Sequence, residues 1–181
     1  MSPPVSNSSA ILILGAGSHA LAVAELAADC GYSSADYLDD ISFVAIAPLS
    51  ELERIAPTYP AVAIAIGNLP VRKALLDRLN AVGAHCPPLI HPTAYVSSSA
   101  RIEDAALVFP RALVHTNAVV ATGAIVSAGA ILDHDATLGS CSHLDAGAVV
   151  ASRATVPPLT KILAGTAFYF SSAPSSTGIV S

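Results

Sequence analysis

Tryptophan is absent from this 181-residue chain, and lysine and arginine together number only eight. With a formal net charge of −5, the chain has too few cations to form a basic surface for a nucleic-acid backbone, so that class of partner is not expected. Cysteine is also scarce. Cys30, Cys86 and Cys141 lie far apart and follow no pairing pattern, which is usual in a reducing compartment.

Long apolar runs are missing too, although 53% of the residues are hydrophobic. No run approaches the roughly 18 residues that a helix needs to span a bilayer. The first residues, Met1–Pro4, lack the basic segment of a secretion signal, and the first apolar run, Ala10–Leu14, is too short for one. We therefore expect a cytoplasmic protein without a membrane span.

What the sequence does contain is a six-residue period. An aliphatic or aromatic residue returns at Ile90, Val96, Ile102, Val108, Val114, Val120, Val126, Leu132, Leu138, Leu144, Val150, Val156, Ile162 and Phe168. Ala, Ser or Thr stands two positions before each member from Val96 onward. A helix has a period of about 3.6 and a simple strand a period of about 2, so six fits neither alone. It is typical of hexapeptide-repeat parallel β-helices, in which short strands and corners alternate.

The period also predicts which residues lie close together. Three hexads would make one triangular coil, so each residue should lie about 4.8 Å from the residue three hexads earlier. The repeat supplies a little over four coils, and the flat sides of such a stack favour packing against neighbouring chains. Repeat proteins are often scaffolds, so the function must be argued from the residues that interrupt the repeat.

The residues before the repeat predict a small α/β domain. We expect buried strands at Ala10–Leu14, Ala35–Leu38 and Ala61–Ile66, and helices up to about Ala28 and from Val71 to Val82. Cys86-Pro87-Pro88 then interrupts the chain. The predicted organisation is a Rossmann-like domain over residues 10–88, a β-helix over residues 89–170 and a disordered tail over residues 171–181.

A glycine turn follows the first strand directly and opens the first helix. Glycines in such a turn let the backbone approach a phosphate, which the helix N–H groups then meet. Asp39 and Asp40 end the second strand, where an acidic pair can accept hydrogen bonds from a ribose or base. A nicotinamide dinucleotide is one candidate. However, the α/β region is roughly half the usual dinucleotide fold and no hydride-transfer domain follows, so a mononucleotide-sized ligand fits better. A tight turn without any ligand is the alternative.

The strongest interruption of the repeat is Leu132-Asp133-His134-Asp135. The stacking should bring His115, Asp133, His134 and Asp135 to one corner. A histidine beside a carboxylate is the arrangement of a general base, because the carboxylate orients the ring. A metal site and a purely structural corner histidine are the alternatives, and the sequence lacks the ligand spacings of common metal motifs.

His143 lies half a coil round from His134, so the two rings should point to different sides of one chain. They could meet only across a seam between subunits.

In its order of motifs, the chain resembles the sugar O- and N-acyltransferases of the sialic acid O-acetyltransferase type. The segments that carry the resemblance are GAGSHA, LDD, AIGNLPVRK, LIHPTAYVSSSARI and LDHDATLGSCSH, within about Ile11–Phe168. These acyltransferases include enzymes that N-acetylate nucleotide-linked 4-amino-4,6-dideoxy sugars. The resemblance implies a left-handed β-helix, a homotrimer and active sites between neighbouring subunits.

The resemblance also assigns residue roles. His134 would be the general base and Asp135 the acid that positions it, with acetyl-CoA as the co-substrate and no metal. His143 and Gly147 would lie in the cofactor site. The residues expected to bind the nucleotide-linked amino sugar are Gly15, Gly17, Ser18, His19, Asp39, Asp40, Asn68 and Arg72.

The sequence departs from this family in two places. The repeat ends at Phe168, whereas members commonly have further coils that help bind CoA, and Ser127 stands where asparagine is common. Several functions therefore stay open beside N-acetylation: O-acetylation of a sugar such as sialic acid, transfer of another acyl group, and sugar-nucleotide binding without catalysis. UDP, GDP and dTDP are not distinguished by the sequence.

Overall fold

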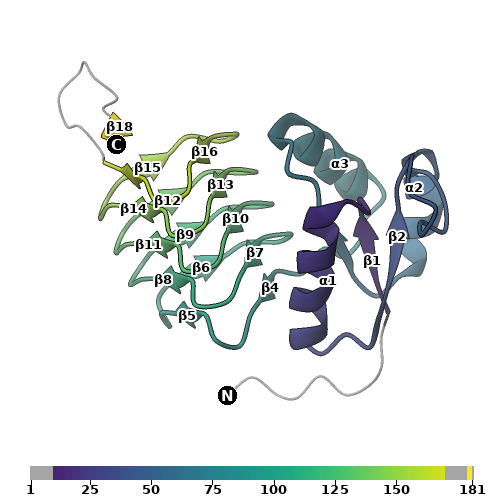
Figure 1. Ribbon diagram of the computed structural model, residues 1–181, viewed down its shortest axis with the longest axis horizontal. Coiled ribbons are helices and arrows are strands. Elements are labelled where there is room, and N and C mark those ends of the chain that lie inside the picture. The colour runs from purple at the N-terminus through teal and green to yellow at the C-terminus, as the bar shows by residue number, and fades with distance from the viewer. Residues whose placement is uncertain (1–9, 170–178, 181) are drawn as a thin grey trace. The chain divides into compact units, whose positions relative to one another are not determined.

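The computed structural model describes residues 10–169 and 179–180. The chain divides into two compact units, Met1–Pro87 and Pro88–Ser181 (Figure 1). An α/β unit with a three-stranded parallel sheet is followed by a β-solenoid of about four turns, which confirms the predicted fold class. The left-handed sense of the solenoid stays a prediction.

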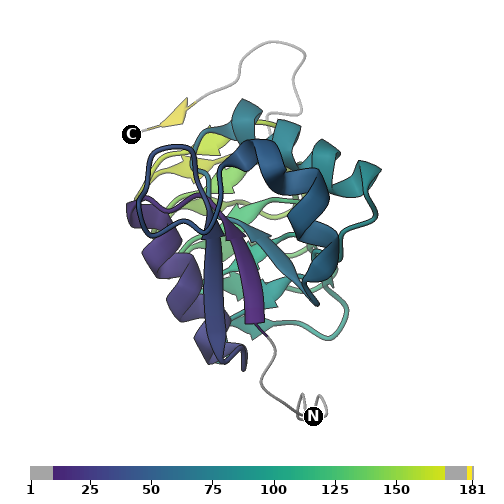
Figure 2. The ribbon, with the colours of Figure 1, turned by 90° about the vertical axis from the view of Figure 1, so that its right-hand side faces the viewer.

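The first unit is built on β1 (Ala10–Leu14), β2 (Ser34–Leu38) and β3 (Val62–Ile64), in the parallel order β2-β1-β3 (Figure 2). α1 (Ser18–Asp29) joins β1 to β2, and α3 (Leu69–Ala81) follows β3. β1 is apolar and almost wholly buried because it has a neighbour on each side. From β1 the chain passes to β2 on one side and then crosses to β3 on the other side. The carboxyl ends of β1 and β3 therefore form a topological switch point, where α/β sheets bind ligands.

Between β2 and β3 the chain forms three short helical turns that the sequence pattern did not predict: η1 (Leu49–Glu51), α2 (Leu52–Ile55) and η2 (Ala56–Thr58). Each is too short to show a helical period. Arg78 of α3 anchors them. Its Nε lies 2.6 Å from Oε1 of Glu53, and its Nη2 donates to the carbonyl of Leu49 at 2.8 Å. The hydrogen bond from Arg78 lowers the pKa of Glu53 to about 2.

The second unit stacks two-residue strands into three sheets, in which β4 to β17 run parallel, visible as three columns in Figure 1. The β4 side contains β4 (Leu89–Ile90), β7 (Leu107–Val108), β10 (Ile125–Val126), β13 (His143–Leu144) and β16 (Lys161–Ile162). The β5 side contains β5 (Tyr95–Val96), β8 (Leu113–Val114), β11 (Ile131–Leu132), β14 (Val149–Val150), β17 (Ala167–Phe168) and β18 (Ile179–Val180). The β6 side contains β6 (Arg101–Ile102), β9 (Val119–Val120), β12 (Thr137–Leu138) and β15 (Thr155–Val156).

The register confirms the predicted stacking of three hexads per coil. Ile125, for example, pairs with Leu107 on one coil and with His143 on the next. In β4 to β17 the second residue of each strand points inward, and the small residues pack beside it. Of the tail predicted to be disordered, only β18 falls within the described residues, where it pairs antiparallel with β17. The rest of that prediction lies outside them.

Most corners of the solenoid require one residue with a left-handed backbone. Glycine takes this place at Gly123, Gly129, Gly147 and Gly165, with φ between 66° and 68°. Other residues take it elsewhere, among them Asn117 (φ 57°), Asp135 (φ 59°) and Arg153 (φ 62°). Asn and Asp are the side chains that tolerate this conformation best. The corner residue beside His134 is therefore held in a fixed, outward-directed position by the backbone itself.

Gly139 tests how tightly the coils pack. A Cβ at this position would lie 2.6 Å from the nitrogen of Pro158 and from the carbonyl oxygen of Val156, which are backbone atoms that cannot move aside. We expect Gly139→Ala to destabilise the protein by roughly 1–3 kcal/mol, as overpacking does, measured by urea unfolding. The control is Gly129→Asn, at a corner with φ +66° and open space around its Cα. Equal stability of the two variants would contradict this account.

Candidate active site

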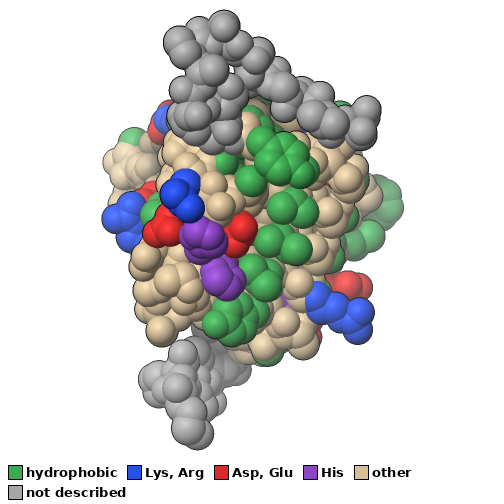
Figure 3. Space-filling model, turned by 90° about the vertical axis from the view of Figure 1, so that its left-hand side faces the viewer, with side chains coloured by type: hydrophobic (Ala, Val, Ile, Leu, Met, Phe, Trp, Pro, Cys, Tyr) green, Lys and Arg blue, Asp and Glu red, His purple; other side chains and the backbone are tan. Residues whose placement is uncertain are grey.

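Four side chains meet where the β5 side turns into the β6 side. His115 lies on the corner between β8 and β9, and Asp133, His134 and Asp135 lie one coil further, between β11 and β12. We call this group the histidine corner. The two turns are joined by a hydrogen bond of 2.8 Å from the amide of Asp135 to the carbonyl of Thr116. Figure 3 shows histidine, acidic and basic side chains gathered on this face, and the predicted grouping is confirmed.

His134 and Asp135 form the closest pair in the histidine corner. Nδ1 of His134 lies 2.8 Å from Oδ2 of Asp135. The hydrogen bond from His134, followed by one from Asn117, lowers the pKa of Asp135. An ionised carboxylate only accepts hydrogen bonds, so Nδ1 must carry the ring proton and Nε2 is left as the basic nitrogen. The His134 side chain is 39% exposed, so Nε2 can receive a proton from a bound substrate.

Asn117 and Arg153 support this pair, and the sequence analysis missed both. They occupy the same left-handed corner position as Asp135, one coil before it and one coil after it. Nδ2 of Asn117 donates to Oδ1 of Asp135 at 3.0 Å, and the charge of Arg153 further favours the ionised carboxylate. The spacing of three hexads could have identified them, because it places all three residues in one column.

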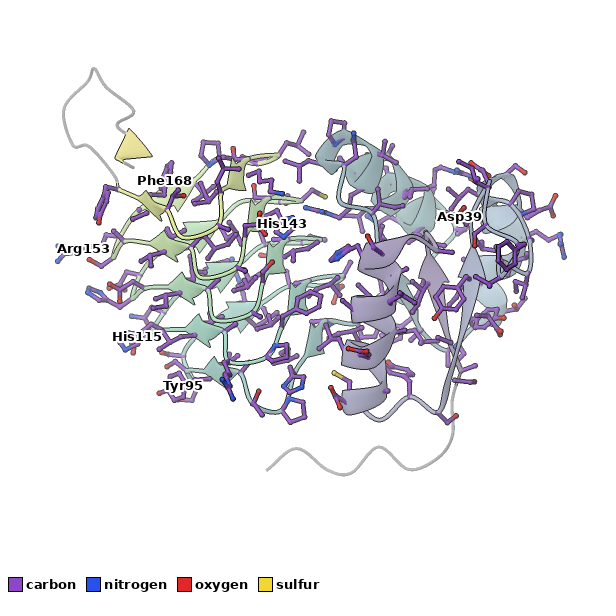
Figure 4. All side chains as sticks on the ribbon, viewed as in Figure 1. Asp39, Tyr95, His115, His143, Arg153 and Phe168 are labelled. Carbon is purple, nitrogen blue, oxygen red and sulfur yellow. The ribbon has the colours of Figure 1, made fainter. Side chains whose placement is uncertain are left out.

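Asp133 organises the turn rather than the His134 ring. Its Oδ1 accepts the backbone N–H of His134 at 2.7 Å and lies 4.0 Å from Nδ1 of His115. The rings of His115 and His134 meet edge to face, with their centroids 6.1 Å apart. His115 and Arg153 are labelled at the outer edge of the solenoid in Figure 4. The side chains of His115 and His134 therefore lie next to each other and form one polar surface at this corner.

His143 belongs to a separate cluster on β13. Its Nε2 lies 2.9 Å from Oγ of Ser127 and 3.9 Å from Oδ1 of Asp145. Nζ of Lys161 lies 3.1 Å from Oδ2 of Asp145. Burial is the largest single effect on Asp145 and opposes its ionisation. The hydrogen bonds from Lys161 and from the backbone N–H of Ala146, with the charges of His143 and Lys161, together outweigh it, and the pKa of Asp145 is lowered. Gly147 follows at the next left-handed corner, where an added Cβ would meet no atom within 4 Å.

The two histidine sites are on different parts of the solenoid. His143 is on the β4 side, whereas His134 is at the corner between the other two sides. In a three-sided stack this corner is opposite the β4 side. The two rings therefore face different directions within one chain, as the hexad spacing predicted.

The predicted phosphate loop lies at the carboxyl end of β1. Gly15 has φ 99°, and a Cβ there would lie 2.7 Å from Cδ1 of Ile66, so only glycine fits. Gly17 precedes α1 as its N-cap, and Ser18 and His19 are the first residues of that helix. The first turn of α1 contains no acidic residue, so the positive end of the helix dipole remains available to an anion.

Asp39 and Asp40 already have backbone partners. Oδ2 of Asp39 accepts the N–H of Ala16 at 2.9 Å, and its Oδ1 accepts those of Ile41 and Ser42 at 2.9 and 2.8 Å. These three bonds lower the pKa of Asp39. Oδ1 of Asp40 accepts the N–H of Leu49 at 2.8 Å. Both carboxylates thus shape the loops around the sheet edge, and their contact with a ligand stays a prediction.

Asn68 and Arg72 shape the neighbouring loop. Oδ1 of Asn68 caps α3 by accepting the N–H of Val71 at 3.1 Å. Arg72 is 1% exposed, and its Nη1 donates to the carbonyl of Ile66 at 3.0 Å. These two bonds connect the start of α3 with the residues that follow β3, which explains why Asn68 and Arg72 are four positions apart. A direct role of either residue in binding a sugar nucleotide stays a prediction.

Within residues 10–169 and 179–180, no group of three or more His, Cys, Asp or Glu side chains is arranged to hold a metal ion. Among the same residues, the helices are too short or too polar to cross a membrane.

A small α/β unit with a glycine turn, followed by a hexapeptide solenoid with a histidine–carboxylate pair at one corner, defines a class: the two-domain hexapeptide-repeat acyltransferases. Comparison with known proteins agrees. Residues 10–79 match the family model of the PglD N-terminal domain.

Solved structures extend the match to the solenoid. PerB from Caulobacter crescentus, in complex with CoA and GDP-perosamine, is 25% identical with a TM-score of 0.68, covering 88% of this chain and 83% of PerB. The acetyltransferase domain of PglB from Neisseria gonorrhoeae, in complex with acetyl coenzyme A, is 26% identical with a TM-score of 0.57, covering 91% of this chain and 97% of that domain. WeeI from Acinetobacter baumannii, 17% identical with a TM-score of 0.51 over 94% of this chain and 99% of WeeI, shares the fold.

Over both units the chain is thus similar to the PglD-type hexapeptide-repeat sugar N-acetyltransferases. This confirms the resemblance seen in its motifs.

The supporting role of Asn117 can be measured directly. Asn117→Ala removes one of the two side-chain hydrogen bonds that favour the charged form of Asp135, so the pKa of Asp135 should rise toward its ordinary value. His134→Ala should raise it further, because the bond from His134 is the larger cause. Carboxyl-detected NMR titration of the three proteins gives the order. An Asp135 pKa that is unchanged in Asn117→Ala would show that the hydrogen bond contributes nothing.

Proposed function

We propose that this chain is an acetyl-CoA-dependent N-acetyltransferase acting on the amino group of a nucleotide-linked 4-amino sugar. The observation that carries the proposal is the His134–Asp135 pair, with Nδ1 bonded at 2.8 Å and Nε2 directed away from it. Its family and the ligands bound to PerB and PglB support the choice of substrates. Because the similar structures include the GDP-perosamine N-acetyltransferase of Caulobacter crescentus, N-acetylation is preferred over O-acetylation.

The chemistry follows from the protonation state of the pair. The neutral amine of the sugar attacks the thioester carbonyl of acetyl-CoA, forming a C–N bond, and Nε2 of His134 takes one proton from the nitrogen. Asp135 stabilises the resulting imidazolium. The C–S bond then breaks, and the sulfur leaves as thiolate, which takes the proton from His134. General-base catalysis of this kind contributes about 10²–10⁴-fold, so holding the two substrates together must supply much of the remainder.

His143 is assigned to the acyl-CoA side of the reaction. It neighbours Lys161 on the next coil, and Lys161 lines a cavity of about 450 Å³ together with Leu163 and Phe168. An apolar cavity with one cation at its edge suits the pantetheine arm and phosphates of CoA. Gly147 lies near this cluster in sequence, and its open surroundings leave room for the cofactor. This cavity lies on the last coils of the solenoid and is our candidate for the CoA site.

A complete site needs two chains. His134 and His143 face different directions in one chain, so the sugar amine at His134 would meet the thioester at the His143 of a neighbour. The outward residues of the β5 side form an apolar ladder next to the histidine corner: Tyr95, Leu113, Ile131, Val149 and Ala167. Figure 3 shows this row beside the histidines. Its exposure supports a homotrimer in which these ladders pack against neighbouring chains. The cytoplasm stays the expected location.

The proposed base is tested by replacing it. Purified protein should release free thiol from acetyl-CoA when given a UDP-, GDP- or dTDP-linked 4-amino sugar. His134→Ala should lower kcat by about 10²–10⁴-fold, because His134 is the one ring of the histidine corner that lies within hydrogen-bond distance of a carboxylate.

His91→Ala is the matched control. His91 lies on another corner of the solenoid, and its Nδ1 accepts the N–H of Thr93 in its own turn at 3.0 Å. It should keep nearly full activity. Thiol release that is unchanged in His134→Ala would remove His134 from its proposed role. Tight binding of a sugar nucleotide without turnover of any acyl-CoA would favour a non-catalytic binding protein.

The trimer can be tested on the apolar ladder. Ile131 is 36% exposed, and Ile131→Asp would place a charge in the middle of the proposed contact. Light scattering after gel filtration should show a fall from trimer to monomer, together with loss of activity. Thr155→Asp, an exposed position on the β6 side, should remain trimeric and active. A wild-type protein that is monomeric and fully active would overturn the proposal of a shared site.

A further inference from the structure

A serine hydroxyl and an imidazole form a hydrogen-bonded pair on the solenoid, away from the histidine corner. Oγ of Ser127, the first residue after β10, lies 2.9 Å from Nε2 of His143, which β13 places one coil further. Ser127 is half-buried, and the side chain of His143 is 10% exposed. Figure 4 labels His143 on the solenoid. A hydroxyl within hydrogen-bond reach of an imidazole is the arrangement of an activated nucleophile.

Asp145 lies where it can stabilise the charge that such a nucleophile creates. If Nε2 of His143 takes the hydroxyl proton, the ring becomes an imidazolium, and Oδ1 of Asp145 lies 3.9 Å from that nitrogen. Nζ of Lys161 and the N–H of Ala146, each 3.1 Å from the Asp145 carboxylate, hold it in place. A carboxylate beside the base favours the charged ring, as in the serine–histidine–aspartate sites of acyl-transfer enzymes.

The backbone next to Ser127 offers a donor for a developing oxyanion. The turn after β10 is closed by the N–H of Ala130, which donates to the carbonyl of Ser127 at 3.1 Å. In the described part of the chain, the N–H of Ala128 inside this turn donates to no other group, and Ala128 is exposed. The N–H of the residue after a nucleophilic serine is a common oxyanion donor in acyl transfer. Ala128 holds that position relative to Ser127.

The acyl donor can reach this pair. Lys161, which holds Asp145, also lines the cavity that is our candidate for the CoA site. A pantetheine arm in that cavity can therefore deliver its thioester beside Asp145 and His143. Ser127 is also one of the places where the sequence departs from the family that it resembles, in which asparagine is common. A side-chain amide does not form an ester, so the serine supplies a nucleophile that asparagine would not.

We propose that Ser127 is a covalent acyl acceptor: acetyl-CoA acetylates its hydroxyl, and the ester passes the acetyl group to the amino group of the sugar. The inference rests on the proposed function for its two substrates. It adds a covalent route beside direct attack of the amine on the thioester, and both routes give the same products. Acyl transfer through a covalent intermediate divides one difficult step into two easier ones.

Atoms and protons balance in both transfers. In the first, Oγ of Ser127 attacks the thioester carbonyl while Nε2 of His143 takes the hydroxyl proton. The C–S bond breaks, and the thiolate takes that proton and leaves as CoA. In the second, the sugar amine attacks the ester carbonyl, and Nε2 of His134 from a neighbouring chain takes a proton from the nitrogen. The C–O bond breaks, and this proton returns to Oγ of Ser127.

Acetylation of Ser127 can be observed without the sugar. Protein mixed with acetyl-CoA alone and quenched in acid should carry a single acetyl group, located on Ser127 by peptide mass spectrometry. Hydroxylamine, which cleaves esters and leaves amides, should remove it. Ser127→Ala should stay unlabelled, and Ser127→Cys should carry a thioester instead. At saturating acetyl-CoA, His143→Gln should slow labelling by about 10²–10⁴-fold, as loss of a general base does.

Ser97→Ala is the matched control. Ser97 likewise directly follows a strand of the solenoid, but its Oγ lies 3.2 Å from Oγ of Ser99 and has no histidine beside it. This variant should be labelled on Ser127 as the wild type is.

The labelled protein also tests whether the ester is productive. Freed of acetyl-CoA by gel filtration, it should lose its acetyl group when a nucleotide-linked 4-amino sugar is added, and the N-acetylated sugar should appear in equal amount. The 4-hydroxy counterpart of the sugar, which lacks the amine, should leave the label in place.

The outcomes separate this inference from the proposed function. Absence of an acetyl group on Ser127, or a hydroxylamine-resistant one on Lys161 in its place, overturns the inference even if the wild type acetylates its sugar. An ester on Ser127 that is lost more slowly than the wild type turns over also overturns it, in favour of direct attack. An ester on Ser127 in a protein that acetylates no 4-amino sugar supports Ser127 as the acyl acceptor and removes the proposed function.

Discussion

The repeated parallel register of the solenoid is the constraint on which the rest of the second unit depends. Each strand contributes only two residues, so no single coil could bury a core, and each coil relies on backbone hydrogen bonds to the coils on either side. The inward residues and the small residues beside them then form one continuous core along the axis. Because the register is fixed, every corner residue has a defined neighbour one coil away. The histidine corner exists only because two turns are held in this alignment.

The same register explains how much of the fold could be predicted. A period of six residues is rare, so the sequence predicted the strands, the coils and the meeting of His115 with Asp133. The three short helical turns between β2 and β3 were missed because none is long enough to show a period. The left-handed backbone of Asp135 was missed as well. Aspartate is not glycine, and the conformation follows from the corner rather than from the residue itself.

The site residues were predicted less completely, for a physical reason. Sequence motifs identify residue types but not their partners. Asn68 and Arg72 resemble ligand-binding residues, yet in the structure they cap α3 and hold the carbonyl of Ile66. The carboxylate of Asp39 likewise accepts three backbone N–H hydrogen bonds. Asn117 was overlooked in turn, because a lone asparagine carries no motif and acquires its importance only through the carboxylate one coil away.

The ionised form of Asp135 is favoured by its two neighbours in the same column of corners, Asn117 and Arg153. All three side chains leave the backbone at equivalent corner positions, one coil apart, so neighbouring positions differ by the spacing between strands, about 4.8 Å. A charge-changing substitution of Asn117 or Arg153 therefore alters the electrostatic environment of Asp135. Evolution, or an engineer, can therefore adjust how strongly the ionised form of Asp135 is favoured by changing residues one coil away.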